Sequence, residues 1–464
     1  MRNFSELATF VVIVALWSIM STYTVFYWLI NGEMKMESHF DISAVTAALL
    51  AISLTNMSVW IVVYIIYPFV ANKWIKRQQL LIDRNNDMDS NHMLPLVSII
   101  IPARNEENVI RRTISNCLQQ TYRQVEVIVV CHNCTDKTYE QACTDNKRVR
   151  VFDLNNSPSG KGIALNFGLD KANGTYICIV DSDGRLAPDF IRNILPLFDL
   201  GYAAVQGKIE PSNRNFNLIT TLLGLESDLF SYPYMIVRDF LSKRTPLGGT
   251  GFVIKRDILI SEGRFSNGLV DDFQLSFKLF RRKYRIAFAP LSVVYDEKPP
   301  TLHLLFNQRS RWIKRHMDLL DEKTAEIKDL MGIIYWLSPV SMIAGFCLIC
   351  VTSFAIIHLL LFGYYPYAFT YLPVKIWLLT VVITFLLQLY ILFQKREHRN
   401  VRDVIHTALL IPFSQYWYVV LIKAFFVKSW TNTKTPHGFD APEAPFRSAS
   451  EIKPNLRNDK KQVC

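Results

Sequence analysis

The chain has 464 residues, 50% of them hydrophobic and 20% charged, with a formal net charge of +11. This length exceeds that of one ordinary domain, and the hydrophobic share is high for a soluble protein, which excludes a small water-soluble domain. The Lys and Arg residues cluster beside apolar blocks and along residues 309–315. That placement favours anionic lipid headgroups as partners and disfavours nucleic-acid binding.

Two uncharged segments near the start, residues 8–30 and 44–71, predict membrane-spanning helices. Each is long enough to cross a hydrocarbon core of about 30 Å at about 1.5 Å per residue. We interpret the first as an anchor, because its apolar run is too long for a signal peptide and no small-residue cleavage site follows. Acidic residues between the two segments and basic residues after the second predict a cytoplasmic middle region. We thus expect two transmembrane helices in residues 1–71 and a cytoplasmic linker at 72–95.

The middle of the chain, residues 96–312, alternates apolar runs with stretches of helical spacing. Four apolar runs with the length of strands lie at residues 96–101, 125–130, 149–152 and 176–180. Strands that alternate with helices predict an α/β domain with a parallel, Rossmann-like sheet. Past the fourth run the pattern becomes mixed, with short strands expected at 203–205, 251–254 and 285–289 and helices at 216–241 and 271–282.

Polar loops follow three of these strands, at residues 102–106, 133–136 and 181–183. Because functional loops of such sheets lie at the carboxyl ends of strands, we expect the three loops to share one edge. Asp181 and Asp183 follow a buried strand, and Mg²⁺ prefers one or two carboxylates together with phosphate oxygens, so this pattern suits a metal-bound sugar nucleotide. No Gly-x-Gly-x-x-Gly follows the first strand, which disfavours a nicotinamide or flavin domain.

Cys131 and Cys134 flank His132 and Asn133 in a Cys-x-x-Cys pattern. A structural zinc site needs four ligands, and no second Cys pair or His pair follows at the spacing of a zinc finger. In a cytoplasmic domain the eight cysteines of the chain should be reduced thiols. We therefore disfavour a zinc site here.

Three further apolar segments follow the middle region, at residues 332–362, 371–393 and 404–426. The basic loop before the last segment is expected inside, so a complete final crossing would put the basic tail outside. Pro412 and the polar pair at 414–415 interrupt that segment, which favours a broken or re-entrant hairpin that returns the tail to the cytoplasm. We expect an interfacial helix at 313–331, a C-terminal transmembrane region at 332–426 and a basic, poorly ordered tail at 427–464.

Several ordered motifs between residues 96 and 312 resemble those of family-2 membrane glycosyltransferases, which include hyaluronan, chitin, cellulose and poly-N-acetylglucosamine synthases. The motifs are two nucleotide loops at 102–106 and 133–136, Gly160-Lys161-Gly162, Asp181-Ser182-Asp183, Gly248-Gly249-Thr250-Gly251, Asp271-Asp272 and Gln308-Arg309-Ser310-Arg311-Trp312. The resemblance implies an α/β fold, with a cytoplasmic GT-A (Rossmann-like) glycosyltransferase domain at 96–312 inserted between transmembrane helices.

The resemblance also implies a role for each motif. It assigns the nucleotide-sugar site to Ala103, Glu106, Asp136, Lys161, Asp181, Gln308, Arg311 and Trp312. It assigns the acceptor site to Gly249, Thr250, Gly251, Asp271 and Trp312, the metal site to Asp183 and Asp181, and base catalysis to Asp272. The implied metal is Mg²⁺ or Mn²⁺ on the diphosphate. The chain departs from the family pattern in two places: it has Asp271 in place of the commoner Glu, and cysteines at 131 and 134. Neither departure removes a required chemical group.

Structural explanations also exist for several of these residues. Asp136 precedes a helical stretch and can serve as its N-cap. Asp272 opens a predicted helix, whose amino-terminal dipole should keep the carboxylate ionised. The glycine cluster at 248–251 is typical of a simple turn. Residues 308–312 place an amide, a guanidinium and an indole on one helix face, and their basic neighbours also fit a helix that lies on the bilayer.

Three functions compete. The first is a membrane-embedded inverting β-glycosyltransferase that takes a UDP-sugar, extends a polysaccharide and translocates it. The second transfers one sugar to a lipid carrier or lipid-linked acceptor. The third, a transporter with a degenerate cytoplasmic domain, is disfavoured because ionisable residues such as Lys375 and His406 are few in the apolar segments and lie mostly near their ends.

The expected location of the enzyme is the plasma membrane, crossed several times, with the catalytic domain in the cytoplasm. The expected partners are the UDP-sugar donor, a growing glycan or lipid-linked acceptor, and membrane lipids, without nucleic acid. The sequence leaves open whether an accessory export subunit is also a partner.

Overall fold

The computed structural model describes residues 42–88, 94–155, 157–158, 160–266, 271–321, 360–363, 371–394, 400–414 and 416–427. The predicted segment 8–30, most of the segment 332–362 and the tail from residue 428 lie outside these ranges. The chain divides into two compact units, one comprising residues 1–68 and 320–422, the other residues 69–319 and 423–464.

The second unit contains a sheet of eight strands in the order β3-β2-β1-β4-β7-β6-β8-β5. Their bounds are β1 Val97–Ala103, β2 Val125–His132, β3 Val149–Leu154, β4 Tyr176–Ile179, β5 Arg185–Leu186, β6 Ala204–Pro211, β7 Phe252–Lys255 and β8 Ile286–Asp296. The first four strands pair in parallel, as predicted. Beyond them, where the sequence pattern becomes mixed, β7 runs antiparallel to both β4 and β6. The fold is therefore a mixed α/β sheet.

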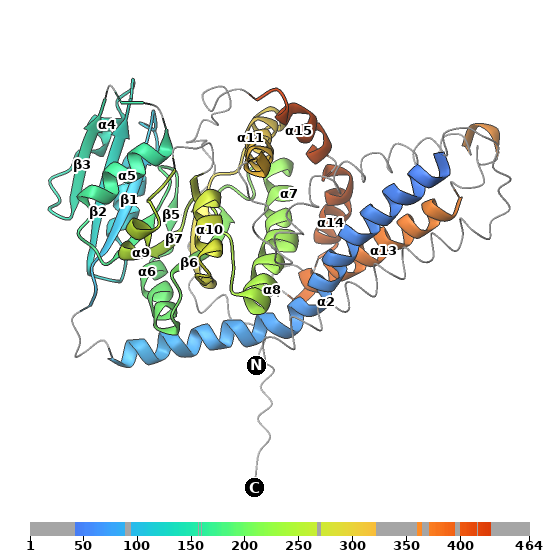
Figure 1. Cartoon of the computed structure of the whole chain (residues 1–464), viewed down its shortest axis with the longest axis horizontal. Helices are drawn as coiled ribbons and strands as arrows, with labels where there is room; N and C mark the ends of the chain where they lie inside the picture. Colours follow the sequence, from blue (N-terminus) through green and yellow to red (C-terminus); the bar gives the residue numbers. More distant parts are fainter. Residues whose placement is uncertain are drawn as a thin grey trace, which may run out of the picture. The chain divides into compact units, whose positions relative to one another are not determined.

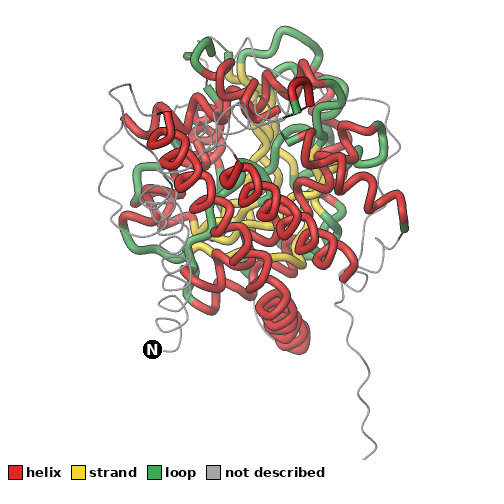
Figure 2. The backbone as a smooth tube through the Cα atoms, turned by 90° about the vertical axis from the view of Figure 1, so that its right-hand side faces the viewer, coloured by secondary structure: helices red, strands yellow, loops and turns green. Residues whose placement is uncertain are grey.

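Helices cover both faces of this sheet (Figures 1 and 2). The helices described in this unit after α2 (Ile42–Met88) are α3 Ile110–Leu118, α4 Thr138–Ala142, α5 Lys161–Lys171, α6 Phe190–Ile194, the 3-10 helix η1 Leu195–Leu200, α7 Leu218–Glu226, the π-helix η2 Ser227–Ser231, α8 Tyr232–Ser242, α9 Arg256–Ser261, α10 Asp271–Arg281 and α11 Leu302–Asp321. Alternate side chains of a strand point to opposite faces. Accordingly Ile99 and Ile101 share a core with α3 and α6, whereas Ile100 packs in a second core with α5, α9 and α10.

Helix α2, Ile42–Met88, is longer than the predicted span and continues through most of the segment that we expected to be a linker (Figure 1). Its carboxyl half packs against the sheet. The indole nitrogen of Trp74 donates to the carbonyl of Phe288 in β8 at 2.9 Å. The Gln78 side chain donates to Asn193 O at 3.2 Å and accepts from Leu291 N at 3.1 Å. Residues 72–88 are therefore a docked helix.

The first unit contains the amino half of α2 together with α13 Tyr371–Gln394 and α14 Val401–Phe413. Gln388 on α13 donates to the Tyr64 hydroxyl at 3.2 Å. Two helices share the predicted segment 404–426: α14 ends at Phe413, and α15 runs from Tyr416 to Ala424. This is the interruption that Pro412 and its polar neighbours predicted.

Among the described residues, one helical segment, Met57–Asn85, is long and apolar enough to cross a membrane by length and composition. The apolar stretch Leu379–Gln394 is shorter. Half of the most apolar window in Met57–Asn85 is buried within the protein. The multi-pass arrangement therefore stays a prediction.

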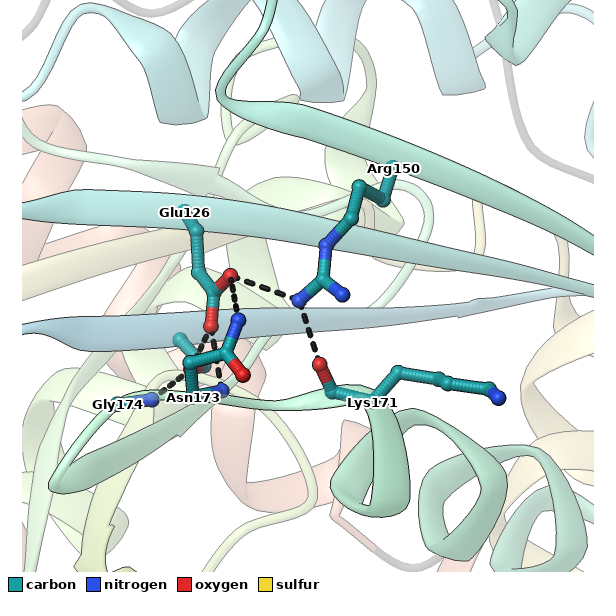
Figure 3. A network of polar contacts seen from close by, with 6 residues as sticks. Glu126, Arg150, Lys171, Asn173 and Gly174 are labelled. Atoms are coloured by element: carbon teal, nitrogen blue, oxygen red, sulfur yellow. Dashed lines mark hydrogen bonds and ion pairs between the residues drawn. The ribbon is translucent and has the colours of Figure 1, made fainter.

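A polar network at the amino ends of the first strands holds the parallel half of the sheet together (Figure 3). The Glu126 carboxylate on β2 accepts from Ser98 Oγ on β1 at 2.6 Å and from Asn173 N at 2.7 Å. Its second oxygen accepts from Arg150 Nη2 on β3 at 2.7 Å. Burial acts to raise the pKa of Glu126, but the hydrogen bonds from Ser98 and Asn173 and the charge of Arg150 outweigh it and lower that pKa.

We predict that Glu126→Ala lowers the free energy of unfolding by about 1–3 kcal/mol, because the donors on Ser98, Asn173 and Arg150 lose a charged acceptor. A lowered pKa means that this contribution is present above the unfolded pKa of about 4.3 and is lost as the pH falls through the folded value. Thermal unfolding of the full chain in detergent, measured from pH 7 downwards, should show the gap from wild type closing in acid. Glu140→Ala, on the exposed side of α4, is the control and should unfold like wild type; equal losses for both variants would contradict the prediction.

Candidate active site

Hydrogen bonds join the loops that follow β1 and β2. Asn105 has a left-handed backbone, with φ of 55°, and its side chain accepts from Thr135 N at 2.8 Å. The backbone N–H of Glu106 donates to the Thr138 hydroxyl at 2.7 Å. Ala103, the last residue of β1, is buried directly beside this junction and pairs in register with Cys131. The two predicted nucleotide loops therefore form one connected edge.

Asp136 has a clear structural role at this junction. Its carboxylate accepts from Thr138 N at 3.0 Å, at the start of α4, and from Glu107 N at 3.3 Å in the other loop. Burial acts to raise the pKa of Asp136, but the hydrogen bonds from Thr138 and Glu107 outweigh it and lower that pKa. The N-cap of α4 is Lys137, so Asp136 is not the cap itself, although it binds the first N–H of the helix. The Thr138 hydroxyl also donates to Asp136, so three bonds occupy most of the about four lone pairs of this carboxylate.

Lys161 connects the donor and acceptor motifs. It is the first residue of α5, and its ammonium group forms an ion pair with Asp181 in the loop after β4. The same ammonium donates to Gly249 O at 3.1 Å. Asp181 N in turn donates to the Thr250 hydroxyl at 3.0 Å. One lysine therefore fixes the distance between the Asp-x-Asp loop and the glycine loop.

The Asp-x-Asp pair provides two carboxylates in different surroundings. The side chain of Asp181 is 35% exposed, whereas Asp183 is buried. The charge of Asp183 acts to raise the pKa of Asp296 at the end of β8, which places these two carboxyl groups near each other. Among the described residues no three His, Cys, Asp or Glu side chains gather as a metal site. The donor set fits Mg²⁺ or Mn²⁺ only as an ion that also takes oxygens from phosphate and water.

The glycine loop is held by Gln206, which the sequence interpretation missed. This fully buried amide on β6 accepts from Gly248 N at 2.7 Å and donates to Thr250 O at 3.0 Å. The loop also needs glycine itself. Gly249 and Gly251 have φ of 80° and 61°, and a Cβ on Gly251 would lie 2.1 Å from Val294 Cγ1. The cluster is a turn, and it contacts Lys161 and Asp181 at the polar edge of the sheet.

Asp272, the second residue of α10, faces this loop. A Cβ on Gly249 would lie 3.0 Å from Asp272 Oδ2. Burial raises the pKa of Asp272 to about 6, assisted by the charge of Asp181 and opposed by Lys161 and by the Phe273 N–H. The helix amino terminus was expected to keep this carboxylate ionised, and the Phe273 N–H does act to lower its pKa, although burial raises it by more. At pH 7 the carboxyl is still mostly ionised, since its pKa lies about one unit lower.

Helix α11 brings the Gln-x-x-Arg-Trp motif to the same edge. Burial lowers the pKa of the Arg311 guanidinium, while the nearby Asp181 and Asp272 carboxylates oppose that shift. Trp312 carries the guanidinium of Arg309 over its ring, 4.0 Å from the ring centre. The Gln308 Oε1 atom is buried and accepts no hydrogen bond within the described part of the chain. Of the three motif residues, Arg311 is therefore the one that lies near the Asp181 and Asp272 carboxylates.

The structure brings most predicted residues to the carboxyl ends of β1, β2 and β4, in two groups. The charged centre consists of Lys161, Asp181, Asp272 and Arg311, with Gly249 beside it. Ala103, Glu106 and Asp136 lie at the neighbouring β1–β2 junction. The side chain of Asp271 lies outside the described part, so its predicted role stays a prediction.

Residues 95–314 match the family model described as "Glycosyltransferase like family 2". The chain is 27% identical to the probable glycosyltransferase YdaM of Bacillus subtilis over 72% of its own length and 83% of that protein. It is 29% identical to a beta-monoglucosyldiacylglycerol synthase of a Nostoc species, over 49% of this chain and 51% of that protein.

The chain is also 25% identical to a poly-beta-1,6-N-acetyl-D-glucosamine synthase of Staphylococcus aureus, over 48% of this chain and 55% of that protein. The chain thus spans about half the length of these last two relatives. Among solved structures, the mannosyltransferase PcManGT of Pyrobaculum calidifontis, in complex with GDP-Man and Mn²⁺, is 18% identical over 82% of this chain and 100% of that chain, with a TM-score of 0.49.

Gly249 and Gly263 provide a matched pair of substitutions. Both have left-handed backbones, with φ of 80° and 82°, but a Cβ on Gly263 meets nothing within 4 Å. Alanine therefore costs a similar backbone strain of about 1–2 kcal/mol at both positions. We predict that Gly249→Ala lowers turnover by about tenfold or more, because its methyl group displaces Asp272, whereas Gly263→Ala keeps near-normal turnover. Steady-state assays with thermal unfolding as the stability control test this, and equal activities would refute it.

Proposed function

We propose that this chain, which belongs to glycosyltransferase family 2 through its residues 95–314, transfers a sugar from a UDP-sugar to an acceptor hydroxyl with inversion. The observation that carries the proposal is the charged centre: Lys161, Asp181, Asp272 and Arg311 lie together on four different elements. Inverting transfer needs a base on the acceptor side and positive charge on the leaving side. This centre supplies both.

The proposed base is Asp272. In the reaction the acceptor oxygen forms a bond to the anomeric carbon, the bond from that carbon to the diphosphate breaks, and the acceptor proton passes to the Asp272 carboxylate. Gly249 has no side chain, so its backbone leaves room for the acceptor sugar beside that carboxylate. The pKa of about 6 suits a base at neutral pH, because the group is ionised yet still basic enough to hold a proton.

The leaving diphosphate is proposed to lie between Arg311 and Lys161. A guanidinium binds phosphate oxygens in a planar, two-pronged geometry, and the lysine adds a second positive charge. Asp181 and Asp183 would hold Mg²⁺ or Mn²⁺, which would neutralise further charge on the diphosphate. Gln308 is proposed to accept a hydrogen bond from the donor sugar, because its buried Oε1 accepts none among the described residues.

The uridine is proposed to bind at the β1–β2 junction. Three hydrogen bonds to Asp136 leave about one lone pair for the base or ribose. Glu106 follows Asn105, whose side chain connects the two loops. Ala103 is proposed to form the base of this site, since it is buried at the end of β1.

The first candidate acceptor is a growing polysaccharide that the enzyme itself translocates. In this proposal, transmembrane helices at 1–71 and 332–426 flank the catalytic domain at 96–312 in the plasma membrane. Trp312 would stack on a sugar of the acceptor chain, since an indole face suits the apolar face of a pyranose. The poly-beta-1,6-N-acetyl-D-glucosamine synthase among the relatives supports this assignment.

A second candidate acceptor is a lipid. Helices α13 to α15 expose large apolar side chains, among them Leu379, Leu386, Ile405 and Ile422. An acceptor carried in the bilayer could approach the enzyme along such surfaces. The beta-monoglucosyldiacylglycerol synthase among the relatives supports this alternative.

We predict that Asp272→Asn lowers turnover by about 10²- to 10⁴-fold and leaves UDP binding within a few-fold of wild type. In the wild type the ionised carboxylate is the active form, so kcat/KM should be constant above pH 7 and fall on the acid side with an apparent pKa near 6. The measurements are initial rates from pH 5 to 8.5 and UDP titration by calorimetry. Near-normal turnover of the variant would exclude Asp272 as the base.

We predict that membranes containing the protein incorporate label from one UDP-sugar only with Mg²⁺ or Mn²⁺ present, and that EDTA abolishes incorporation. A long, glycosidase-sensitive product establishes the polysaccharide acceptor. A single labelled sugar that partitions into organic solvent establishes the lipid acceptor. Membranes with Asp272→Asn are the control, and absence of label from a full panel of UDP-sugars would contradict the proposed function.

A further inference from the structure

The Cys131-x-x-Cys134 segment lies at the end of β2, inside the β1–β2 junction. Asn133 between the cysteines has a left-handed backbone, with φ of 52°, which turns the chain sharply. Two bonds hold this turn: Asn133 N donates to Leu154 O at 3.1 Å, and the Asn133 amide donates to Ser157 O at 2.8 Å. The turn brings the Cys134 thiol back to β1, where it donates to Ala103 O at 3.6 Å.

The same turn brings the two cysteine side chains into one apolar cluster, in which Cys131 is buried and Cys134 packs against it. Ala103, whose carbonyl accepts from Cys134, is the register partner of Cys131. Cys131 is fully buried and Cys134 is half-buried, so a reagent from solution reaches Cys134 first. Cys143, which is exposed, is the third cysteine in this neighbourhood.

The surroundings also decide which sulfur is the nucleophile. The hydrogen bond from Cys131 lowers the pKa of the Cys134 thiol to about 7, against the opposing effects of burial and of Asp136. The bond to Cys134, burial and the nearby Asp153 and Cys143 groups raise the pKa of Cys131 well above its usual range. A thiolate at neutral pH is the reactive form of cysteine, and it resides on the more accessible sulfur.

We propose that Cys131 and Cys134 are a redox modification site that closes to a disulfide by exchange with a low-molecular-weight disulfide such as oxidised glutathione. The Cys134 thiolate attacks one sulfur of that reagent, and the first thiolate leaves. The Cys131 thiol then loses its proton and attacks Cys134 in the mixed disulfide, and the second thiolate leaves. The protein dithiol is oxidised and the reagent is reduced to two thiols, so atoms and electrons balance.

Closure should weaken nucleotide binding, a consequence that rests on the proposed function. A disulfide requires a sulfur–sulfur distance of about 2.05 Å, shorter than any thiol–thiol hydrogen bond, so Cys134 must move towards Cys131. It also removes the thiol hydrogen that Cys134 donates to Ala103 O. Thr135 and Asp136 follow Cys134 directly in the chain, so a shift of Cys134 also displaces the loop that we assign to uridine.

The first test is independent of nucleotide. The full chain in detergent is equilibrated with reduced and oxidised glutathione, quenched with an alkylating reagent and mapped by mass spectrometry. We expect a Cys131–Cys134 link that dithiothreitol reverses, that Cys134→Ser abolishes and that the matched variant Cys143→Ser leaves intact. Two free thiols throughout, a stable glutathione adduct on Cys134 alone, or a link to Cys143 would each overturn the proposal.

The second test measures UDP affinity of the oxidised and reduced protein by calorimetry. We expect oxidation to weaken binding at least threefold in wild type and in Cys143→Ser, and to have no effect in Cys134→Ser. If the link forms but affinity is unchanged, the redox site stands and its coupling to nucleotide is refuted. If reduced protein fails to bind UDP at all, the proposed function fails, while the mapping result is unaffected.

Discussion

The candidate site depends on the balance of four charges at a poorly solvated edge of the sheet. Lys161 and Arg311 are the cations, and Asp181 and Asp272 are the carboxylates. A buried charge is costly unless an opposite charge lies nearby, and burial shifts the pKa values of both Asp272 and Arg311. The Lys161 and Asp181 side chains, each 35% exposed, supply the opposite charges. Because each of the four comes from a different element, the ends of α5, β4, α10 and α11 must meet at one place. Packing of the whole unit is therefore tied to this one electrostatic requirement.

The reversal of β7 is what allows these elements to meet. β4 runs towards the Asp-x-Asp loop, and β7 pairs with it in the opposite direction, so that Phe252 lies opposite Ile179. The residues just before β7 are consequently delivered to the residues just after β4. For this reason the Gly249 carbonyl can accept a hydrogen bond from Lys161. Gln206 on the neighbouring strand β6 holds the same loop by accepting from Gly248 N. A parallel β7 would have placed the glycine loop at the far end of the sheet.

Local sequence pattern predicted much of the fold and less of the chemistry. Apolar runs located β1 to β4, and helical spacing located α10, because these signals come from neighbouring residues. Strand direction, the short β5 and the docking of residues 72–88 depend on partners far along the chain, which no local pattern encodes. Gln206 is a polar residue in an apolar strand and belongs to no motif. For Asp272, the backbone N–H of Phe273 at the helix start lowers the pKa, but burial, which depends on the tertiary fold, raises it by more.

The pairing of β5 with β8 also constrains the order in which the protein can be assembled. Arg185 lies opposite Tyr295, and this contact closes the region just after Asp183. Contacts between such distant residues form late, and a ribosome releases β8 long after β5. Helix α2 is synthesised before the whole sheet, yet the indole of Trp74 donates to Phe288 of β8. Helix α2 and the Asp-x-Asp loop thus both depend on the same late strand, and a chain truncated before β8 lacks both contacts.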